Sequence, residues 1–577
     1  MEKRTILAIA LTFLIIIFWS VLQNKIFPPP PKPPAEEVKK EAPALPPKTK
    51  EIKEGKPLTE ETLPSKPKTV VKKEASVETP NFWAGFTTDG ARLTYFKLKN
   101  YEDRVEESSF TVRLVHFVQG FWGKKKEFKK PEPLNLVNTS QEEGFPLGLT
   151  FTDSQRSISN GYWEVEKDQL RLLGPGEKGE ITFWTSLENG LKVFKRYRFT
   201  SDKHTIDLEV EIQNATSREV PVQMGLEWTG KAELVKLAEE DNKDYGLRYA
   251  FLKGQKVEKT TFGGAASGGC TPGCSAPKKK IESFESSFKG NIEWYAFEGE
   301  YFAAVLIPPP AEKDLTLSVK GDEKNLLKAS LSPSPFTLPP EQAIKIPFRV
   351  YLGPKEIDWL RELGVNAEKL VDFGFFAIVA KPLLWFLKLT NRVTSNFGID
   401  IIILSILLKI IFIPLTQISM KSMKEMQKVQ PEMARLKEKY KNDKAGLQQE
   451  MMLLYKRRKI NPMSGCLPML IQIPVFIALY NALQNAIEMR HAPFFLWIKD
   501  LSAKDPIYLS PIVMGASMFL QQKMTPTAAD PSQAKMFMFM PILFTFFFLN
   551  FPSGLVLYWF INNVLSIAHQ YYMNKRG

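Results

Sequence analysis

The sequence predicts a polytopic α-helical membrane protein that carries a large antiparallel β-sandwich domain. Its 577 residues are 44% hydrophobic, which would suit a soluble protein, but the apolar residues gather at the two ends of the chain. Several of these apolar runs approach the length that crosses a bilayer as a helix. Between the two ends, apolar and polar residues alternate with the period of β-strands. A chain of this length accommodates two or three domains of such different kinds.

The first apolar run, residues 6–22, follows Lys3 and Arg4 and is long enough to cross a hydrocarbon core of ~30 Å. A cleaved signal peptide would have a shorter apolar core that ends in small residues, whereas this run ends in bulky ones. We therefore expect residues 1–27 to form a transmembrane anchor with a cytoplasmic N-terminus. Residues 28–80 contain no aromatic residue and are dominated by Pro, Lys and Glu, which predicts a disordered linker.

Residues 81–352 show the alternation that is typical of half-buried strands. In the segment 206–213, the aliphatic residues Ile206, Leu208, Val210 and Ile212 alternate with Asp207, Glu209, Glu211 and Gln213. The same period returns over residues 344–350. With turn-forming breaks between such segments, the region predicts an antiparallel β-sandwich of about twenty short strands. Because this region follows the anchor, we expect it to lie outside the cytoplasm.

Residues 353–397 predict a short helix and then an amphipathic helix in the membrane interface, because Lys381, Lys388 and Arg392 interrupt its apolar face. Residues 398–577 contain five apolar segments near spanning length, at about 398–416, 466–486, 507–522, 536–551 and 554–572. Together with the anchor, these segments make six crossings. An even number of crossings returns the C-terminus to the cytoplasmic side.

The loop 417–462 carries a dense set of basic residues, twelve Lys and Arg against three in the loop 487–506. This asymmetry places the basic loop in the cytoplasm. Its pattern predicts a hairpin of two helices, with Met420, Met423, Met426 and Met433 in one stripe and Met451, Met452, Leu454 and Tyr455 facing it. These side chains either form the seam of the hairpin or offer an adaptable apolar surface to client proteins. In the second case, basic faces that include Lys428, Arg457 and Arg458 would meet a polyanion such as ribosomal RNA.

Lys409 lies among bulky apolar residues of the segment 398–416, in the cytoplasmic half of the bilayer. Its ammonium group either snorkels to the cytoplasmic surface or faces a wetted cavity between helices. Other polar or amphipathic residues of the apolar segments are candidates to line such a cavity: Ser405, Gln472, Asn481, Gln521, Gln522, Tyr558, Trp559, Asn562 and Asn563. Taken singly, such residues more often form hydrogen bonds between membrane helices.

Motifs for metal, nucleotide or acyl chemistry are missing from the sequence. The chain has four histidines and three cysteines, with no HExxH, Walker A or GxSxG pattern. We therefore expect no enzymatic activity, no cofactor and no bound metal. Cys270 and Cys274 lie in a Gly-rich segment and allow a local disulfide, whereas a zinc site would need two further ligands.

Three stretches that follow the basic hairpin in order carry a family resemblance: NPMSGCLPMLIQIPVFIALYNAL, RHAPFFLWIKDLSAKDPIYLSPIVMG and FPSGLVLYWFINN. They resemble the YidC/Oxa/Alb family of membrane insertases, and NIEWYAFEGEYFAAVLIP and RVYLGPKEIDWL extend the resemblance more weakly into the β-region. The resemblance implies an inner-membrane protein with cytoplasmic termini and a periplasmic β-supersandwich typical of Gram-negative members. It also implies nascent membrane proteins, the ribosome, the Sec translocon and the lipid bilayer as partners, with no small-molecule substrate.

The same resemblance implies a hydrophilic groove that is open to the cytoplasm and to lipid. Its positive residue falls at Lys409, where most members carry arginine; lysine keeps the charge but lacks the bidentate fork and loses its proton more readily on burial. Client-contact positions fall at Ser405, Tyr558 and Trp559, and Gln521 or Gln522 would add a polar wall.

Two other function classes fit parts of the pattern. A secondary transporter also has polar groups near the midplane and Pro-broken helices, but it predicts internal repeats and usually more spans. The sequence shows no repeat between its halves, and a small-solute carrier does not account for the basic hairpin. A membrane-tethered carbohydrate-active enzyme would need a cluster of carboxylates or histidines in 81–352, where the carboxylates are scattered.

Overall fold

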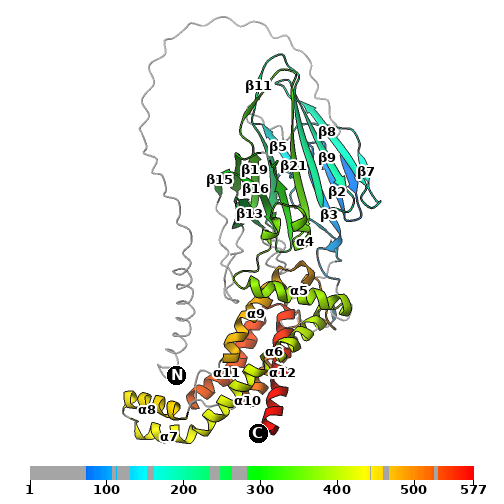
Figure 1. Ribbon diagram of the computed structural model, residues 1–577. Coiled ribbons are helices and arrows are strands. Elements are labelled where there is room, and N and C mark those ends of the chain that lie inside the picture. Colours follow the sequence, from blue (N-terminus) through cyan, green and yellow to red (C-terminus); the bar gives the residue numbers. More distant parts are fainter. Residues whose placement is uncertain are drawn as a thin grey trace, which may run out of the picture. The chain divides into compact units, whose positions relative to one another are not determined.

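The computed structural model describes residues 73–106, 112–113, 130–151, 161–232, 247–262, 283–310, 312–441, 443–458, 467–524 and 531–576 (Figure 1). The predicted anchor, most of the predicted linker and all three cysteines lie outside these residues. The end of the linker prediction was wrong, because Glu74–Glu78 form strand β1. In this strand Ala75 and Val77 are buried, and their alternation with Glu74, Ser76 and Glu78 was hidden by the lysine-rich flank.

The β-region forms four sheets. A nine-stranded sheet has the order β14-β13-β16-β17-β21-β10-β9-β8-β6, and two five-stranded sheets have the orders β15-β18-β19-β12-β5 and β4-β3-β2-β1-β7. Strands β11 and β20 form a two-stranded sheet. The described pairings are antiparallel except that between β1 and β7. The predicted β-sandwich class is therefore confirmed.

The strands run as follows: β1 (Glu74–Glu78), β2 (Phe82–Thr87), β3 (Arg92–Glu102), β4 (Pro133–Asn135), β5 (Gly148–Phe151), β6 (Glu164–Val165), β7 (Gln169–Arg171), β8 (Lys178–Ser186), β9 (Leu191–Thr200), β10 (Thr205–Asn214) and β11 (Val220–Val222). The chain continues with β12 (Met224–Lys231), β13 (Leu247–Lys253), β14 (Lys256–Phe262), β15 (Phe284–Gly290), β16 (Ile292–Glu298), β17 (Phe302–Ile307), β18 (Leu315–Gly321), β19 (Leu326–Ser332), β20 (Phe336–Leu338) and β21 (Ala343–Pro354).

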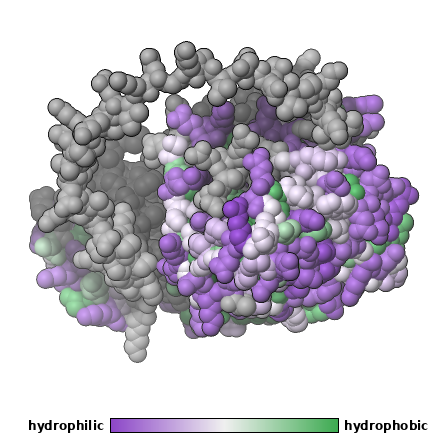
Figure 2. All heavy atoms as spheres, turned by 90° about the horizontal axis from the view of Figure 1, so that it is seen from above, coloured by the Kyte–Doolittle hydropathy of each residue, from purple (hydrophilic) through white to green (hydrophobic). Residues whose placement is uncertain are grey.

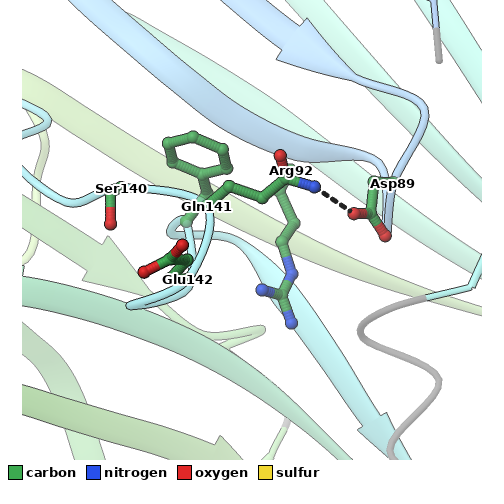
Figure 3. A pocket seen from close by; sticks show the side chains of 6 residues that line it. Asp89, Arg92, Ser140, Gln141 and Glu142 are labelled. Carbon is green, nitrogen blue, oxygen red and sulfur yellow. Dashed lines mark hydrogen bonds between the residues drawn. The ribbon is translucent and has the colours of Figure 1, made fainter.

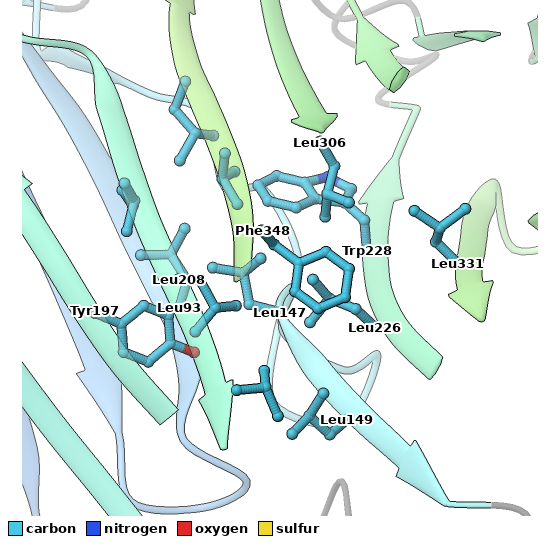
Figure 4. Close-up of a cluster of buried hydrophobic side chains, with 14 of the residues drawn as sticks. Leu93, Leu147, Leu149, Tyr197, Leu208, Leu226, Trp228, Leu306, Leu331 and Phe348 are labelled. Atoms are coloured by element: carbon cyan, nitrogen blue, oxygen red, sulfur yellow. The ribbon is translucent and has the colours of Figure 1, made fainter. Parts of the chain in front are cut away.

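The core of the β-region lies between these sheets. Figure 4 shows Leu208 and Phe348 of the nine-stranded sheet in one apolar cluster with Leu226 and Leu331 of β12 and β19. The aliphatic residues of segment 206–213 are at most 1% exposed, which confirms the predicted alternation. On the other face of β10, acidic residues pair with Arg196, Arg198 and Arg349 of the neighbouring strands. Seen from above, the described surface is mainly hydrophilic, as water contact requires (Figure 2).

The C-terminal region is helical. Its elements are α4 (Ile357–Glu362), η3 (Ala367–Leu370), α5 (Ala377–Thr394), α6 (Phe397–Lys428), α7 (Gln430–Lys439), α8 (Lys444–Arg457), α9 (Leu467–Asn485), η5 (Ile487–Met489), α10 (Leu509–Met524), α11 (Pro531–Phe548) and α12 (Ser553–Arg576). Within the described residues, helix α6 alone is both long and apolar enough to cross a membrane, and Met538–Phe548 is a shorter apolar helix.

Helix α6 corrects a predicted boundary. We expected a span to end near residue 416 and a separate hairpin helix to follow, but α6 continues without interruption through Pro414 to Lys428. Near residue 417 the sequence changes from apolar to charged residues. This change alters the surroundings that the side chains prefer, but the backbone can remain helical across it. The helix ends at Val429, and Pro431 opens α7.

The start of α6 is fixed by buried polar contacts. The side chain of Asn396 caps the helix by accepting from the backbone N–H groups of Gly398 and Ile399. Asp400 is fully buried and accepts hydrogen bonds from Asn391 Nδ2 (2.8 Å) and Thr394 Oγ1 (2.7 Å) at the end of α5. These contacts lock the turn between α5 and α6 and hold the two helices together.

His204 lies in the turn before β10 and contacts helix α4. It is 5% exposed, and its ring packs edge-on against Trp359, with centroids 5.3 Å apart. Its Nδ1 has no hydrogen-bond partner. Burial lowers the pKa of His204 from the ordinary 6.5 to about 4, because the protonated ring would lose its hydration.

We predict that His204 makes the β-region less stable in acid. Below pH 6.5 the unfolded chain binds a proton at this histidine, whereas the folded chain does so only near pH 4. Stability should therefore fall between these two values, by up to an amount on the order of 3 kcal/mol. The measurement is the unfolding free energy of wild type and His204→Phe, from pH 8 to pH 4. A wild-type minus variant difference that stays constant with pH would contradict the prediction.

Candidate functional site

Helix α12 is the centre of the helical region. It packs against α6 and α10, while α11 packs on α10 and α9 on α5. Residues 551–558, which lead into and form its first turns, are all buried. Further along, α12 presents polar side chains to its neighbours. The candidate site is therefore built around this helix.

Tyr558, Asn562 and Ser566 follow one another at intervals of four residues on α12, so they lie on one face of the helix. We call these three residues the polar stripe. Asn562 Nδ2 donates to the carbonyl of Tyr558 (2.9 Å), and Ser566 Oγ donates to the carbonyl of Asn562 (2.7 Å). Asn562 and Ser566 thus each bond to the backbone one turn before them, which stabilises their polar groups in an apolar setting.

Lys409 of α6 reaches this polar stripe. It is half-buried, and its Nζ donates a hydrogen bond of 2.6 Å to Ser566 Oγ. The ammonium group therefore points at α12, while Ile410 and Ile411 beside it are more than half exposed. Among the described residues, no acidic side chain forms an ion pair with Lys409. Within the part of the chain that the structure describes, the side-chain partner of this cation is a neutral hydroxyl.

Ser405 and Tyr558, two predicted client contacts, lie inside the packing. Ser405 is fully buried, and its hydroxyl donates to the carbonyl of Ile401 (2.7 Å). Tyr558 is also fully buried, and its hydroxyl accepts a hydrogen bond from Gln472 Nε2 of α9. In this conformation neither side chain lies on an open surface.

Trp559 is half-buried in an aromatic cluster. Its ring lies 5.1 Å from Phe476 of α9 and 5.5 Å from Phe548 of α11, measured between centroids. Its indole Nε1 is buried without a hydrogen-bond partner. A buried indole N–H normally finds an acceptor, so this unpaired donor is unusual.

The contacts between α10 and α12 do not centre on the two predicted glutamines. Gln521 and Gln522 are both half-buried on α10. Asn563 Nδ2 donates instead to Ser517 Oγ (3.1 Å), and Gln570 Nε2 donates to the carbonyl of Met524 (2.6 Å). Sequence reasoning missed Ser517, Ser566 and Gln570. The spacing of four from Tyr558 through Asn562 would have identified Ser566.

The methionines of the hairpin divide into buried and exposed ones. Met426 and Met433 pack with Val429 and Leu454 in a small core, with Met451 and Tyr455 beside it. Met420 is buried as well, and Met423 is half-buried. The expectation that Met452 also faces the stripe was wrong: it is 55% exposed, since it lies about 100° around the helix from Met451.

The predicted basic residues of the hairpin are exposed and carry acidic neighbours. Lys428 pairs with Glu425 (3.2 Å), Arg457 with Glu450 (3.7 Å) and Arg458 with Glu432. Exposed ion pairs of this kind contribute about 0–1 kcal/mol to stability, so each basic side chain can readily exchange its carboxylate partner for another anion. Within the described ranges, no group of three or more His, Cys, Asp or Glu residues is arranged to hold a metal ion.

Comparison with known proteins covers the whole chain. The family model described as 60Kd inner membrane protein matches residues 389–577, and the model described as YidC periplasmic domain matches residues 124–386. The membrane protein insertase YidC of Syntrophus aciditrophicus (strain SB) is 40% identical over 595 aligned residues, which cover 100% of both chains. That of Geotalea daltonii is 38% identical and covers 100% of this chain and 99% of its own.

A solved structure, described as an active YidC insertase with the first transmembrane domain resolved, is also similar. It is 19% identical, and the match covers 87% of this chain and 92% of that chain. The TM-score is 0.36. The comparison therefore rests on the full-length sequence similarity and not on this structural match.

We predict that the hairpin depends on Met433. Met433→Asp would place a charge in the small core of Met426, Val429 and Leu454, so α7 and α8 should separate. Amide hydrogen exchange over residues 430–457 should become at least about tenfold faster, because local opening controls exchange. The matched control is Met452→Asp at the exposed position, which should leave exchange unchanged. Equal effects of the two substitutions would contradict the packing.

Proposed function

We propose, on the premise that this chain belongs to the YidC family of membrane protein insertases, that it inserts client proteins into the inner membrane by way of Lys409 and the polar stripe of α12. The premise rests on relatives that are 40% and 38% identical over the full chain. The protein is a membrane protein insertase with a periplasmic domain. The proposal concerns how it works, and it involves no cofactor and no covalent step.

The physical obstacle to insertion lies in the polar flank of the client. A segment of ~20 apolar residues gains free energy on entering lipid, at ~25 cal/mol per Å² of apolar surface. Its polar flank, however, must cross an apolar layer of ~30 Å, and one charge near the middle costs about 2.5–3.5 kcal/mol or more. A protein that shelters the flank part of the way lowers this barrier.

The hydrogen bond from Lys409 to Ser566 is the observation that carries the proposal. A hydroxyl does not neutralise the ammonium group, so a carboxylate from the client that displaced it would gain Coulomb attraction. The polar stripe and the unpartnered indole N–H of Trp559 would then provide further contacts. Gln521 and Gln522 are the proposed polar wall on α10.

The exposed side of α6 supports the release of the client into lipid. Ile406, Ile410 and Ile411 are 42%, 58% and 57% exposed and lie close to Lys409 along the helix. An apolar client segment would pack against them while its flank stays at Lys409. Movement of the segment sideways along this surface then follows its preference for lipid.

The proposed topology is multi-pass, with cytoplasmic termini and a periplasmic β-region. Helix α5 would lie in the interface. It buries Ala380, Leu384 and Leu387, whereas Ile378, Trp385 and Val393 on the other side are 84%, 64% and 88% exposed. Such an exposed apolar stripe, flanked by Lys381 and Arg392, is typical of a helix that rests on a bilayer surface.

The proposed cytoplasmic partners are nascent membrane proteins, the ribosome and the Sec translocon. The exposed side chains of Lys428, Arg457 and Arg458 form ion pairs weak enough to yield to a polyanion. Met426 and Met433 are buried, which makes the apolar contact surface of the hairpin smaller than the sequence suggests, whereas Met452 remains exposed on it. Nothing in the described residues favours a small-solute carrier as a second candidate.

Substitution of Lys409 tests the proposal. With an acidic-tailed client in proteoliposomes, Lys409→Ala should slow insertion at least about fivefold, because about 1 kcal/mol of attraction at 4 Å is lost even in a water-like dielectric. Lys409→Glu should slow it further, and Lys409→Arg should at least match the wild type. The control is the same client with a neutral tail, which the substitutions should affect less. If alanine and glutamate both left the acidic client unaffected, Lys409 would have no electrostatic role.

Crosslinking tests whether clients reach the interior of the helical region. Photoreactive residues at Ser405 and Trp559 should form adducts with ribosome-bound nascent membrane proteins. Because Ser405 is buried in this conformation, its adducts would also report that the helices separate during insertion. Ala478 of α9, buried on a helix that packs against α5, is the matched control and should give no adduct. Adducts absent from both test positions would refute this path.

A further inference from the structure

The β-region contains a pocket of about 690 Å³ that the insertase mechanism does not use. It is lined by Asp89, Arg92, Ser140, Gln141, Glu142 and Phe145 (Figure 3). Arg92 opens strand β3, Asp89 belongs to the turn before it, and the other four residues lie between β4 and β5. None of them is part of the helical region.

Arg92 is the feature that sets this pocket apart. The residue is 8% exposed, and its guanidinium Nε is buried without a hydrogen-bond partner. Burial lowers the pKa of Arg92, and the carboxylates of Glu227 and Asp89 oppose this only in part. Buried charged donors are ordinarily satisfied by an acceptor. Nε itself is closed off from the pocket, but the Arg92 side chain lines it, so the guanidinium group is the cation that a ligand in the pocket would meet.

The backbone under Arg92 is held in an uncommon conformation. Ala91 (φ 48°) and Leu147 (φ 64°) have left-handed backbone angles, and both are fully buried. Lys195 of β9, also fully buried, donates through Nζ to the carbonyls of Gly90 (3.0 Å), Ala91 (3.0 Å) and Leu147 (2.6 Å). Such strain persists only where surrounding contacts enforce it, and it gathers at ligand sites.

A second group from β9 and a glycine complete this support. Tyr197 donates through its hydroxyl to the Ala91 carbonyl (2.7 Å). Gly148 leaves room for the guanidinium, because a Cβ there would lie 3.1 Å from Arg92 Nε. These contacts fix the backbone that carries Arg92, and the Arg92 side chain is part of the pocket lining.

The rest of the lining indicates which ligand chemistry fits. Asp89 accepts a hydrogen bond from Gln141 Nε2 (2.9 Å), and Glu142 and Ser140 are exposed at the rim. Carboxylates at the rim disfavour a polyanion but accept hydrogen bonds from hydroxyl groups. Phe145 adds an apolar wall. One anionic group at Arg92 and several hydroxyls elsewhere satisfy this lining best.

We propose that this pocket binds a small hydroxylated carboxylate, whose carboxylate group accepts from Arg92 and whose hydroxyls meet Asp89, Gln141 and Glu142. Lys195 is a positioning residue in this proposal, because it fixes the backbone on which Arg92 stands. Binding here is independent of the client path at Lys409, so the two proposals stand or fall separately.

The test is calorimetric titration of the full-length protein, in a detergent without a sugar headgroup, with glucuronate and with glucose. The two probes share their ring and hydroxyls and differ in the carboxylate. Glucuronate should bind at least about tenfold more tightly than glucose, because a charge-assisted bond to the guanidinium is about twice as strong as a neutral one. Equal binding of the two, or no binding of glucuronate, would overturn the proposal.

Three variants locate the binding site. Arg92→Met should weaken glucuronate binding at least about tenfold, whereas Lys192→Met removes one exposed charge outside the pocket lining and should leave binding unchanged. Ser140→Trp fills the rim from an exposed loop position and should abolish binding in a protein with a native thermal transition. This variant keeps the test decisive if Arg92→Met fails to fold. Wild-type affinity in Ser140→Trp would place the probe elsewhere.

Discussion

The helical region depends on one constraint, which is that polar groups on α12 must be satisfied among apolar neighbours. Tyr558, Asn562 and Ser566 meet it partly by bonding to the helix backbone and partly through side chains of α9 and α6. Asn563 and Gln570 meet it through α10. Each of these contacts fixes how α12 faces a neighbour, so the same bonds that avoid unsatisfied donors also specify the packing.

Lys195 and Lys409 differ in how many hydrogen-bond acceptors hold the ammonium group. A lysine with several acceptors is fixed in place, whereas a lysine with one acceptor can exchange it for another. Lys195 donates to three backbone carbonyls that cannot move without unfolding the turn. Lys409 donates to one serine hydroxyl, which can rotate away. Lys355 in the β-region represents a third arrangement, since it pairs with buried Glu298 (3.0 Å) and the two charges offset one another. The role proposed for Lys409 rests on this difference.

Helix α6 joins the candidate site to the helical hairpin within one element. Lys409 and the buried Met426 of the hairpin core lie on the same uninterrupted helix. At its other end, the Asn396 cap and the buried Asp400 tie α6 to α5. Lys409 and the hairpin core are therefore joined by the backbone of one helix, which contains Pro414 between them.

The sequence by itself determined the β-sandwich, its alternation and the helical character of the C-terminal region, because burial imposes periods of 2 and 3.6 that short stretches already display. It also singled out Lys409 as an exceptional charge. Only the tertiary structure decided that Ser566 receives this lysine, that Ser405 is buried, and that Met452 faces outward. The pocket around Arg92 was equally beyond the sequence, since Lys195 meets Ala91 across 104 residues. Local patterns fix which face of an element is apolar, whereas the partner of each polar group depends on how distant elements meet.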